Sequence, residues 1–117
     1  MSALVVFEFP PPAPLLSMND RGHWRTRSTR TKEWRTMTAY AALGTRQRNL
    51  PPGIVAVELP VRDNRRRDPH NYFATVKPIV DGLVDASFWP DDTPEWVTTV
   101  EPRLWRGTTV RVVVTER

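Results

Sequence analysis

The stretch that decides the fold is residues 54–61, with the sequence Ile-Val-Ala-Val-Glu-Leu-Pro-Val. Its side chains fall into two alternating rows, and one row contains Val55, Val57 and Leu59. Successive side chains of a β-strand point to opposite faces of a sheet, and β-branched residues favour strands. The alternation therefore predicts a strand near the middle of the chain.

The residues after this strand have the pattern of a helix. A polar turn at residues 63–67 leads to Asp68 and Pro69, which are typical of an N-cap and a first helical position. The apolar positions that follow recur at helical spacing, so we expect them to form a core stripe. Pro78 lies inside that stripe and predicts a kink or a break. The stripe consists of Phe73, Val76, Val80 and Leu83.

A second helix is predicted before the central strand. Thr31 is a suitable N-cap, and we expect the helix to end within residues 44–49. Its apolar stripe consists of Trp34, Met37 and Ala41. Arg35 and Thr38 are expected on the opposite face. The Arg-rich residues 17–30 have the composition of a polar loop.

Strands are also predicted at both ends of the chain. Residues 4–9 are apolar and β-prone, and the prolines that follow stop this strand. Residues 96–100 and 109–115 are predicted to form a terminal hairpin around Arg106 and Gly107. The order strand, helix, strand, helix, strand, strand predicts an α/β (α+β) fold with a small mixed β-sheet and two main helices, in one domain over residues 1–117.

The composition is that of a globular protein with a modest core, and its charge is unevenly distributed. Of the 117 residues, 39% are hydrophobic and 26% are charged, and the formal net charge is +4. Residues 21–48 carry eight basic side chains and one acidic side chain, whereas residues 68–95 carry one basic and six acidic side chains. A basic region beside an acidic one suits a protein that binds a polyanion and holds a cation, and two solvated charge patches are the ordinary alternative.

Several classes of site are excluded. The chain contains no cysteine, so disulfides, zinc-thiolate sites and cysteine nucleophiles are absent. No apolar run approaches the roughly 20 residues of a membrane helix, and the first residues do not have the pattern of a signal peptide. We therefore expect a cytoplasmic protein without a membrane partner.

The residues suited to catalysis are concentrated in three short motifs. Residues 65–71 read Arg-Arg-Arg-Asp-Pro-His-Asn, Lys77 and Asp81 follow on the helix, and residues 88–92 read Phe-Trp-Pro-Asp-Asp. Phosphodiester cleavage uses a divalent metal to polarise the phosphate and activate water, and a nearby ammonium group stabilises the developing charge. Mg²⁺ usually takes one or two carboxylates. The catalytic candidates are Asp68, Lys77 and Asp92; the candidate metal ligands are Asp68, His70, Asp91 and Asp92, with Asn71 and Asp81 as possible supports.

Each of these candidates also has an ordinary structural interpretation. His70, Lys77 and Asp81 have spacings that place them on one face of a continuous helix. However, Asp68 can be an N-cap alone, and the Asp91-Asp92 pair can be simple turn chemistry. Lys77 can pair with Asp81 as neighbours on a helix surface do. The spacing leaves both interpretations open.

Arginine-rich segments supply candidates for contacts to DNA. Guanidinium groups match phosphate geometry, and an exposed aromatic ring among them can stack on a base. Trp24 has such surroundings, whereas the helical phase of Trp34 assigns it to the core. The triplet at residues 65–67 is either a phosphate-binding segment or a solvated basic turn. The candidate DNA-binding residues are Arg21, Trp24, Arg25, Arg27, Arg30, Lys32, Arg65, Arg66 and Arg67.

In order, Arg-Arg-Arg-Asp-x-x-Asn, a helix carrying Lys and Asp, and Phe-Trp-x-Asp-Asp resemble the RusA family of Holliday junction resolvases, which are phage- and prophage-associated endonucleases. The resemblance extends through most of the chain and implies a homodimer of small α/β subunits. It implies a nuclease of DNA recombination and repair that binds four-way junctions and hydrolyses them with Mg²⁺ or Mn²⁺ held by aspartates. By matching position, Asp68 resembles the family's first catalytic aspartate, and Lys77 resembles its catalytic lysine. Asp91 and Asp92 resemble the family's paired acidic turn, and Asp81 resembles a helix aspartate of lesser role.

The chain departs from this family pattern in two places. His70 stands where the family usually has a second aspartate, and histidine binds Mn²⁺ more readily than Mg²⁺ but supplies no negative charge. The segment from Asn71 to Asp91 is also slightly longer than in the best-known members. The sequence therefore predicts a metal-dependent junction endonuclease, with a catalytically weakened junction-binding protein as the alternative. A small basic scaffold protein, whose aspartates are only caps and turns, is a third possibility.

Overall fold

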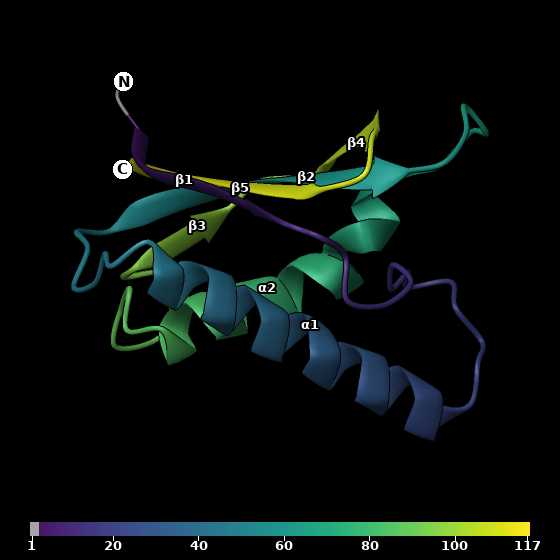
Figure 1. Ribbon diagram of the computed structural model, residues 1–117, viewed down its shortest axis with the longest axis horizontal. Coiled ribbons are helices and arrows are strands. Elements are labelled where there is room, and N and C mark those ends of the chain that lie inside the picture. The colour runs from purple at the N-terminus through teal and green to yellow at the C-terminus, as the bar shows by residue number, and fades with distance from the viewer. Residues whose placement is uncertain (1–2) are drawn as a thin grey trace.

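The computed structural model describes residues 3–117 and places a mixed sheet against two helices. In chain order the elements are β1 (Ala3–Phe9), α1 (Trp24–Gly44), β2 (Gly53–Val61), a 3₁₀ helix η1 (Pro69–Tyr72), α2 (Phe73–Asp85), β3 (Val97–Thr99), β4 (Arg103–Arg106) and β5 (Val110–Glu116). Figure 1 shows the sheet as one layer and both helices together on one of its faces. This arrangement confirms the α+β class predicted from the order of the elements.

The sheet has five strands, and β2 is its most paired member. On one side β2 pairs antiparallel with β5, which in turn pairs antiparallel with β1. On its other side β2 pairs in parallel with two short strands, β3 near its beginning and β4 near its end. The apolar row of β2 is buried, as the alternating pattern led us to expect.

The predicted terminal hairpin is wrong. β3 and β4 lie on one side of β2, whereas β5 lies on the other, so the turn at Gly107 carries the chain across the end of β2. Alternation along a segment specifies its two faces but not its neighbour in a sheet. Here β5 pairs with β2 and β1 instead of with β4, its neighbour in sequence, and both β2 and β5 carry deeply buried valines.

Helix α1 begins at Trp24, whereas the sequence predicted a start at Thr31. The ring Nδ1 of His23 accepts a hydrogen bond from the backbone N–H of Arg25 at 3.1 Å and caps the helix. Figure 1 shows that the first turns of α1 extend past the sheet, so these turns need no apolar stripe. Arginine is a good helix former, and residues 24–30 of the segment assigned to a loop are helical, whereas residues 17–23 form a loop as predicted.

The buried face of α1 is also rotated relative to the prediction. It consists of Trp34, Thr38 and Ala42, so Thr38 is not on the solvent face. The Thr38 hydroxyl donates to the carbonyl of Trp34 at 2.8 Å, which satisfies it within the helix. Gly82 of α2 explains the rotation, because a Cβ there would lie 2.8 Å from Cβ of Thr38 and 2.7 Å from the carbonyl oxygen of Arg35. The two helices therefore pack backbone to backbone at this point.

The helix predicted after Asp68 forms in two parts. Asp68 caps η1, with its Oδ1 accepting from the N–H of His70 at 3.1 Å, and Pro69 follows as the first helical residue. α2 then continues through Pro78 without a break, and Pro78 is buried against the core. The predicted core stripe is confirmed for Val76, Val80 and Leu83, whereas Phe73 is only partly buried.

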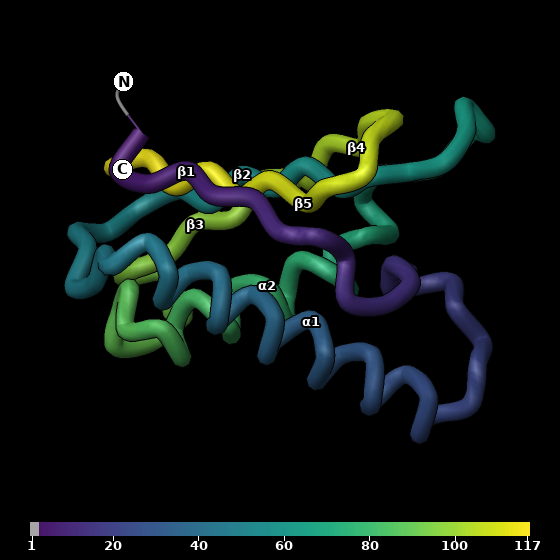
Figure 2. The backbone as a smooth tube through the Cα atoms, viewed as in Figure 1, coloured from purple at the N-terminus to yellow at the C-terminus, as the bar shows by residue number. Residues whose placement is uncertain are grey.

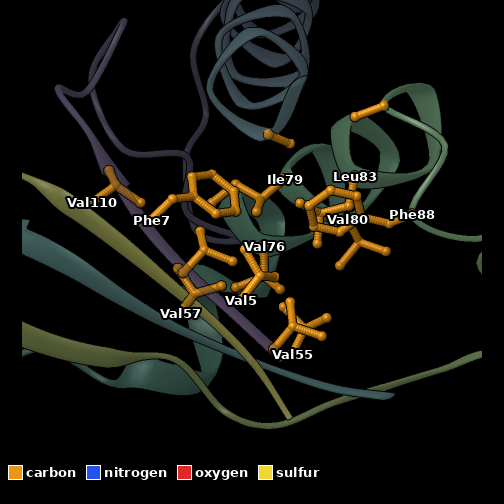
Figure 3. Close-up of a cluster of buried hydrophobic side chains, with 14 of the residues drawn as sticks. Val5, Phe7, Val55, Val57, Val76, Ile79, Val80, Leu83, Phe88 and Val110 are labelled. Carbon is orange, nitrogen blue, oxygen red and sulfur yellow. The ribbon is translucent and has the colours of Figure 1, made fainter. Parts of the chain in front are cut away.

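One hydrophobic cluster fills the space between the sheet and the helices. Figure 3 shows side chains of β1 and β2 meeting those of α2 and Phe88. At the cluster's edge the buried Thr75 hydroxyl accepts from the N–H of Leu16 at 2.8 Å and donates to its carbonyl at 2.7 Å. This exchange fastens the proline-rich segment after β1 to α2. No helix of the described residues is long and apolar enough to cross a membrane.

Candidate functional site

The centre of the candidate site is the ammonium group of Lys77, which lies between two carboxylates. Its Nζ donates to Oδ1 of Asp81 at 3.0 Å and also forms a short ion pair with Oδ2 of Asp92. Lys77 and Asp81 are one turn apart on α2, whereas Asp92 comes from the loop after it. The ordinary surface pairing of Lys77 with Asp81 is therefore present, and Asp92 is added to it.

Buried aromatic side chains position the loop that carries Asp92. Phe88 and Trp89 are almost fully buried, and the indole Nε1 of Trp89 donates to the carbonyl of Pro51 at 2.8 Å. Ser87 turns the chain at the end of α2 with a positive φ of 68°. Asp91 lies in the same turn, but its Oδ1 accepts from the N–H of Asp92 at 2.7 Å. The two neighbouring aspartates therefore differ, since only Asp92 contacts Lys77.

The ion pair keeps both partners charged over the neutral range. The hydrogen bond from Lys77 lowers the pKa of Asp92 below its usual value, and burial opposes this effect only in part. The hydrogen bond to Asp92 in turn raises the pKa of Lys77, with a further contribution from Asp81. The Asp92 side chain is 30% exposed and that of Lys77 65% exposed, so the pair remains open to water and to a ligand.

A shallow groove of about 430 Å³ runs beside this pair. Apolar side chains of α2, of β3 and of the preceding loop form its walls, with Lys77 and Asp92 at its polar edge. The lining residues include Phe73, Val76, Val80, Pro94, Val97 and Thr99. The groove offers low-dielectric surroundings next to a lysine held between two carboxylates, where interactions between charges are stronger than in bulk water.

The other predicted ligands lie toward the beginning of η1. Asp68 and His70 are exposed, and the His70 ring packs edge-on against Phe73 with centroids 5.3 Å apart. The backbone carbonyl of Asn71 accepts from the N–H of Met18 at 2.8 Å, so Asn71 ties η1 to the loop before α1. Helical rise places Lys77 roughly 15 Å along the axis from Asp68. No hydrogen bond between described residues joins these residues to Lys77 or Asp92.

The aspartate oxygens are the type of ligand that a hard cation prefers, but they are few in number. Within residues 3–117, no group of three or more His, Cys, Asp or Glu side chains is arranged to hold a metal ion. Mg²⁺ usually takes only one or two carboxylates and fills its remaining positions with water and phosphate oxygens. The ionised carboxylate of Asp92 and the exposed carboxylate of Asp68 each fit that mode singly, but roughly 15 Å of helix separates Asp68 from Lys77, so the structure does not bring the two carboxylates to one site. A site of this kind depends on the substrate to complete it.

Asp85 has a different, structural role. The guanidinium of Arg35 on α1 binds it through two hydrogen bonds, of 2.7 Å to Oδ2 and 2.8 Å to Oδ1. The bond to Arg35 lowers the pKa of Asp85. This bidentate pair joins the two helices at the place where Gly82 allows them to approach.

The predicted DNA-binding residues of the first half divide into two groups. Trp24 is 67% exposed, and the guanidinium of Arg25 lies over its ring, 5.4 Å from the centroid. Arg21 and Lys32 are also exposed. By contrast, Arg27 donates to the carbonyl of Asp20 at 2.7 Å, and Arg30 lies 3.9 Å from its carboxylate. The last two residues hold the preceding loop against α1.

The Arg65-Arg66-Arg67 triplet divides in the same way. The Arg67 side chain is 13% exposed, pairs with Asp63 at 2.9 Å and donates to the carbonyl of Arg65 at 3.0 Å. Arg67 therefore closes the loop that Figure 2 shows projecting from the end of β2. Arg65 and Arg66 stay exposed on this loop.

Arg117 is a residue that the sequence did not identify as part of the site. Its guanidinium donates to the carbonyls of Pro94 at 2.6 Å and Glu95 at 2.7 Å, and to the hydroxyl of Thr98 at 3.0 Å. It thereby fixes the segment that follows Asp92. Nothing local identifies this role, because the contacts span 19–23 residues of chain.

The fold and the site together define a small α+β domain with a lysine–carboxylate pair at the edge of a groove. No protein-family model matches the chain, and no curated protein matches it either.

Proposed function

We propose that the protein is a structure-specific endodeoxyribonuclease that binds Holliday (four-way) DNA junctions and resolves them by metal-dependent phosphodiester hydrolysis. The resemblance to the RusA family supplies this activity. The observation that carries the proposal is the contact of Lys77 with Asp92, residues 15 positions apart in sequence. Both match motif positions of that family, and both lie at the edge of an open groove.

The residues have distinct roles in this proposal. Mg²⁺ or Mn²⁺, when bound with Asp68, Asp92 and the neighbouring His70 and Asp91 as candidate ligands, supplies Lewis-acid activation of the phosphate. Asp92 is ionised at neutral pH, and because its Oδ2 is paired with Lys77, its Oδ1 is the atom that would bind a cation. The Lys77 ammonium stabilises negative charge that develops on the phosphate or the leaving oxygen. Asp81 holds Lys77 in place from the same helix.

The distribution of exposed cations elsewhere on the molecule favours a polyanionic substrate. Exposed cations stand at the start of α1 and on the loop after β2, where they include Arg21, Arg25, Arg65 and Arg66. Phosphate contacts of this kind supply most of the affinity for DNA. We further propose a cytoplasmic homodimer, in which two copies place one site on each side of the branch point.

The test is cleavage of a labelled synthetic four-way junction in Mg²⁺ or Mn²⁺. We expect paired symmetric nicks from the wild type and a loss of about 100-fold or more in Asp92→Asn. Glu95→Gln is the matched control, because it removes an exposed carboxylate from the same loop and leaves Asp92 in place. The proposal fails if the wild type makes no symmetric nicks with either metal, or if Asp92→Asn cleaves as well as the control.

A second candidate function is junction binding without efficient cleavage. One observation favours it: His70 stands where the family that the chain resembles usually has an aspartate. This alternative predicts salt-sensitive binding of the intact junction and a gain of cleavage in His70→Asp. Efficient cleavage by the wild type excludes it.

A further inference from the structure

A second groove, away from the Lys77–Asp92 pair, lies between the loop after β2 and β4. It has a volume of about 540 Å³ and is open to solvent at the end of the sheet. That volume falls in the range of sites that bind small molecules, so a short length of extended strand fits it better than a whole duplex. Its lining includes Arg65, Arg67, Arg103, Trp105 and Arg106.

The charges of this groove are unequal. Four arginines line it against two acidic residues, Asp63 and Glu101. Asp63 and Arg67 neutralise each other in an ion pair, which leaves three arginines against Glu101. An excess of guanidinium groups in a concave surface attracts a polyanion and matches the geometry of its phosphates.

The arginines of β4 are available to a ligand. The side chain of Arg103 is 78% exposed and makes only a long contact of 3.3 Å with Glu58. Exposed pairs of this kind contribute little stability, so the guanidinium can turn to a phosphate at small cost. No hydrogen bond or ion pair from another described residue engages the guanidinium of Arg106.

Trp105 stands between these two arginines and gives the groove an aromatic wall. Its side chain is partly buried, and its indole Nε1 donates to the carbonyl of Thr109 at 3.2 Å, which fixes the ring. The ring also covers Gly107, where any Cβ would lie 2.2 Å from it. A fixed ring among guanidinium groups is a surface on which a sugar or base can pack.

We propose that this groove binds one strand of the DNA substrate, with Arg65, Arg103 and Arg106 contacting its phosphates and Trp105 packing against the nucleotide. The inference rests on the proposed DNA-binding function and adds a contact surface on β4 to it. Pro69, the neighbour of Asp68, also lines the groove. One side of the groove is therefore formed by the chain segment that also carries Asp68.

The test measures binding of a fluorescent four-way junction without divalent metal, over a series of salt concentrations. We expect Arg103→Gln/Arg106→Gln to weaken binding about tenfold or more. The slope of log affinity against log salt should also fall by about 0.9 for each lost phosphate contact. The matched control, Arg46→Asn/Arg48→Gln, removes two exposed arginines from the loop between α1 and β2, a loop that Figure 1 shows at the opposite end of the molecule from β4. It uses asparagine where Arg46 has a positive φ of 62°. A melting curve shows whether each variant folds.

The outcomes separate this inference from the proposed function. If the wild type does not bind the junction, both fail. If the wild type binds and the two double variants behave alike, the groove on β4 is not a DNA site while the proposed function stands. Polyglutamate serves as the probe for an acidic protein partner. If Arg103→Gln/Arg106→Gln loses as much affinity for polyglutamate as for DNA, the inference is overturned in favour of such a partner. A specific loss for DNA with a reduced salt slope supports it.

Discussion

At the residue scale, the Lys77–Asp92 pair should matter far more for reactivity than for stability. Both side chains are partly exposed, and exposed ion pairs contribute at most about 1 kcal/mol. We expect Lys77→Met to cost no more than that in free energy of unfolding but to reduce junction cleavage about 100-fold. Urea denaturation and single-turnover cleavage of the same preparation measure the two effects. A fully active Lys77→Met variant would remove Lys77 from the site.

The small contribution of this ion pair to the free energy of unfolding should depend on pH in a defined direction. The pKa of Asp92 is lowered in the folded protein, so its contribution is present above its unfolded pKa and disappears as pH falls through the folded value. The pKa of Lys77 is raised, so its contribution is present below its unfolded pKa and is lost at high pH. The difference in unfolding free energy between wild type and Lys77→Met should therefore be constant over the neutral range and vanish as pH falls through the lowered pKa of Asp92. A difference that increases toward acid pH would contradict this.

At the element scale, the approach of α1 to α2 depends on Gly82. A methyl group there would lie 2.7 Å from the carbonyl oxygen of Arg35, so Gly82→Ala should push the helices apart and destabilise the protein by about 1–3 kcal/mol. This is opposite in sign to the usual gain from replacing a helical glycine. Gly44→Ala is the control, because a Cβ at Gly44 meets nothing within 4 Å. Equal unfolding free energies for the two variants would mean that the helices separate without cost.

The link from α2 to the proline-rich segment depends on one hydroxyl group. Thr75→Val leaves both the N–H and the carbonyl of Leu16 without their buried partner. We expect a loss of about 2 kcal/mol or more in unfolding free energy. Thr36→Val, on the exposed face of α1, should change it by less than about 0.5 kcal/mol. Thermal or urea unfolding of the two variants provides the comparison.

At the scale of the whole molecule, the sequence predicted what burial imposes locally and missed what depends on distant partners. The valines of β2, the stripe on α2 and the burial of Trp34 followed from periodicity, because each faces one core. The first turns of α1 carry no such signal, since they project beyond that core. β4 and β5 pair with opposite sides of β2, and Asp92 contacts Lys77. Both arrangements join segments far apart in sequence, so spacing alone did not predict them.

The binding of a metal can be tested through the folding equilibrium of the whole chain. A cation that binds only the folded protein at 100 times its Kd adds about 2.7 kcal/mol of stability, which raises Tm by roughly 10 °C for a domain of this size. We expect Mn²⁺ or Mg²⁺ to raise the Tm of the wild type and of Glu95→Gln, and not that of Asp92→Asn. The absence of any shift in the wild type, even in the presence of junction DNA, would favour a scaffold whose aspartates are only caps and turns.

The same melting experiment decides whether Asp68 and Asp92 bind one ion, although Asp68 lies just before η1 and Asp92 lies in the loop after α2, where it contacts Lys77. If a shared cation joins them, Asp68→Asn and Asp92→Asn each remove most of the metal-dependent rise in Tm, and the double variant removes no more. Such non-additivity is the signature of residues that act as a unit. If Asp92 binds the ion without Asp68, the Asp68→Asn variant keeps the full rise, and the role of Asp68 is then confined to its cap on His70. The substrate's phosphate completes a site that has few protein ligands. The melting curves of the three variants should therefore also be measured with junction DNA in the presence of Ca²⁺, which has the same charge as Mg²⁺ and also binds oxygen ligands.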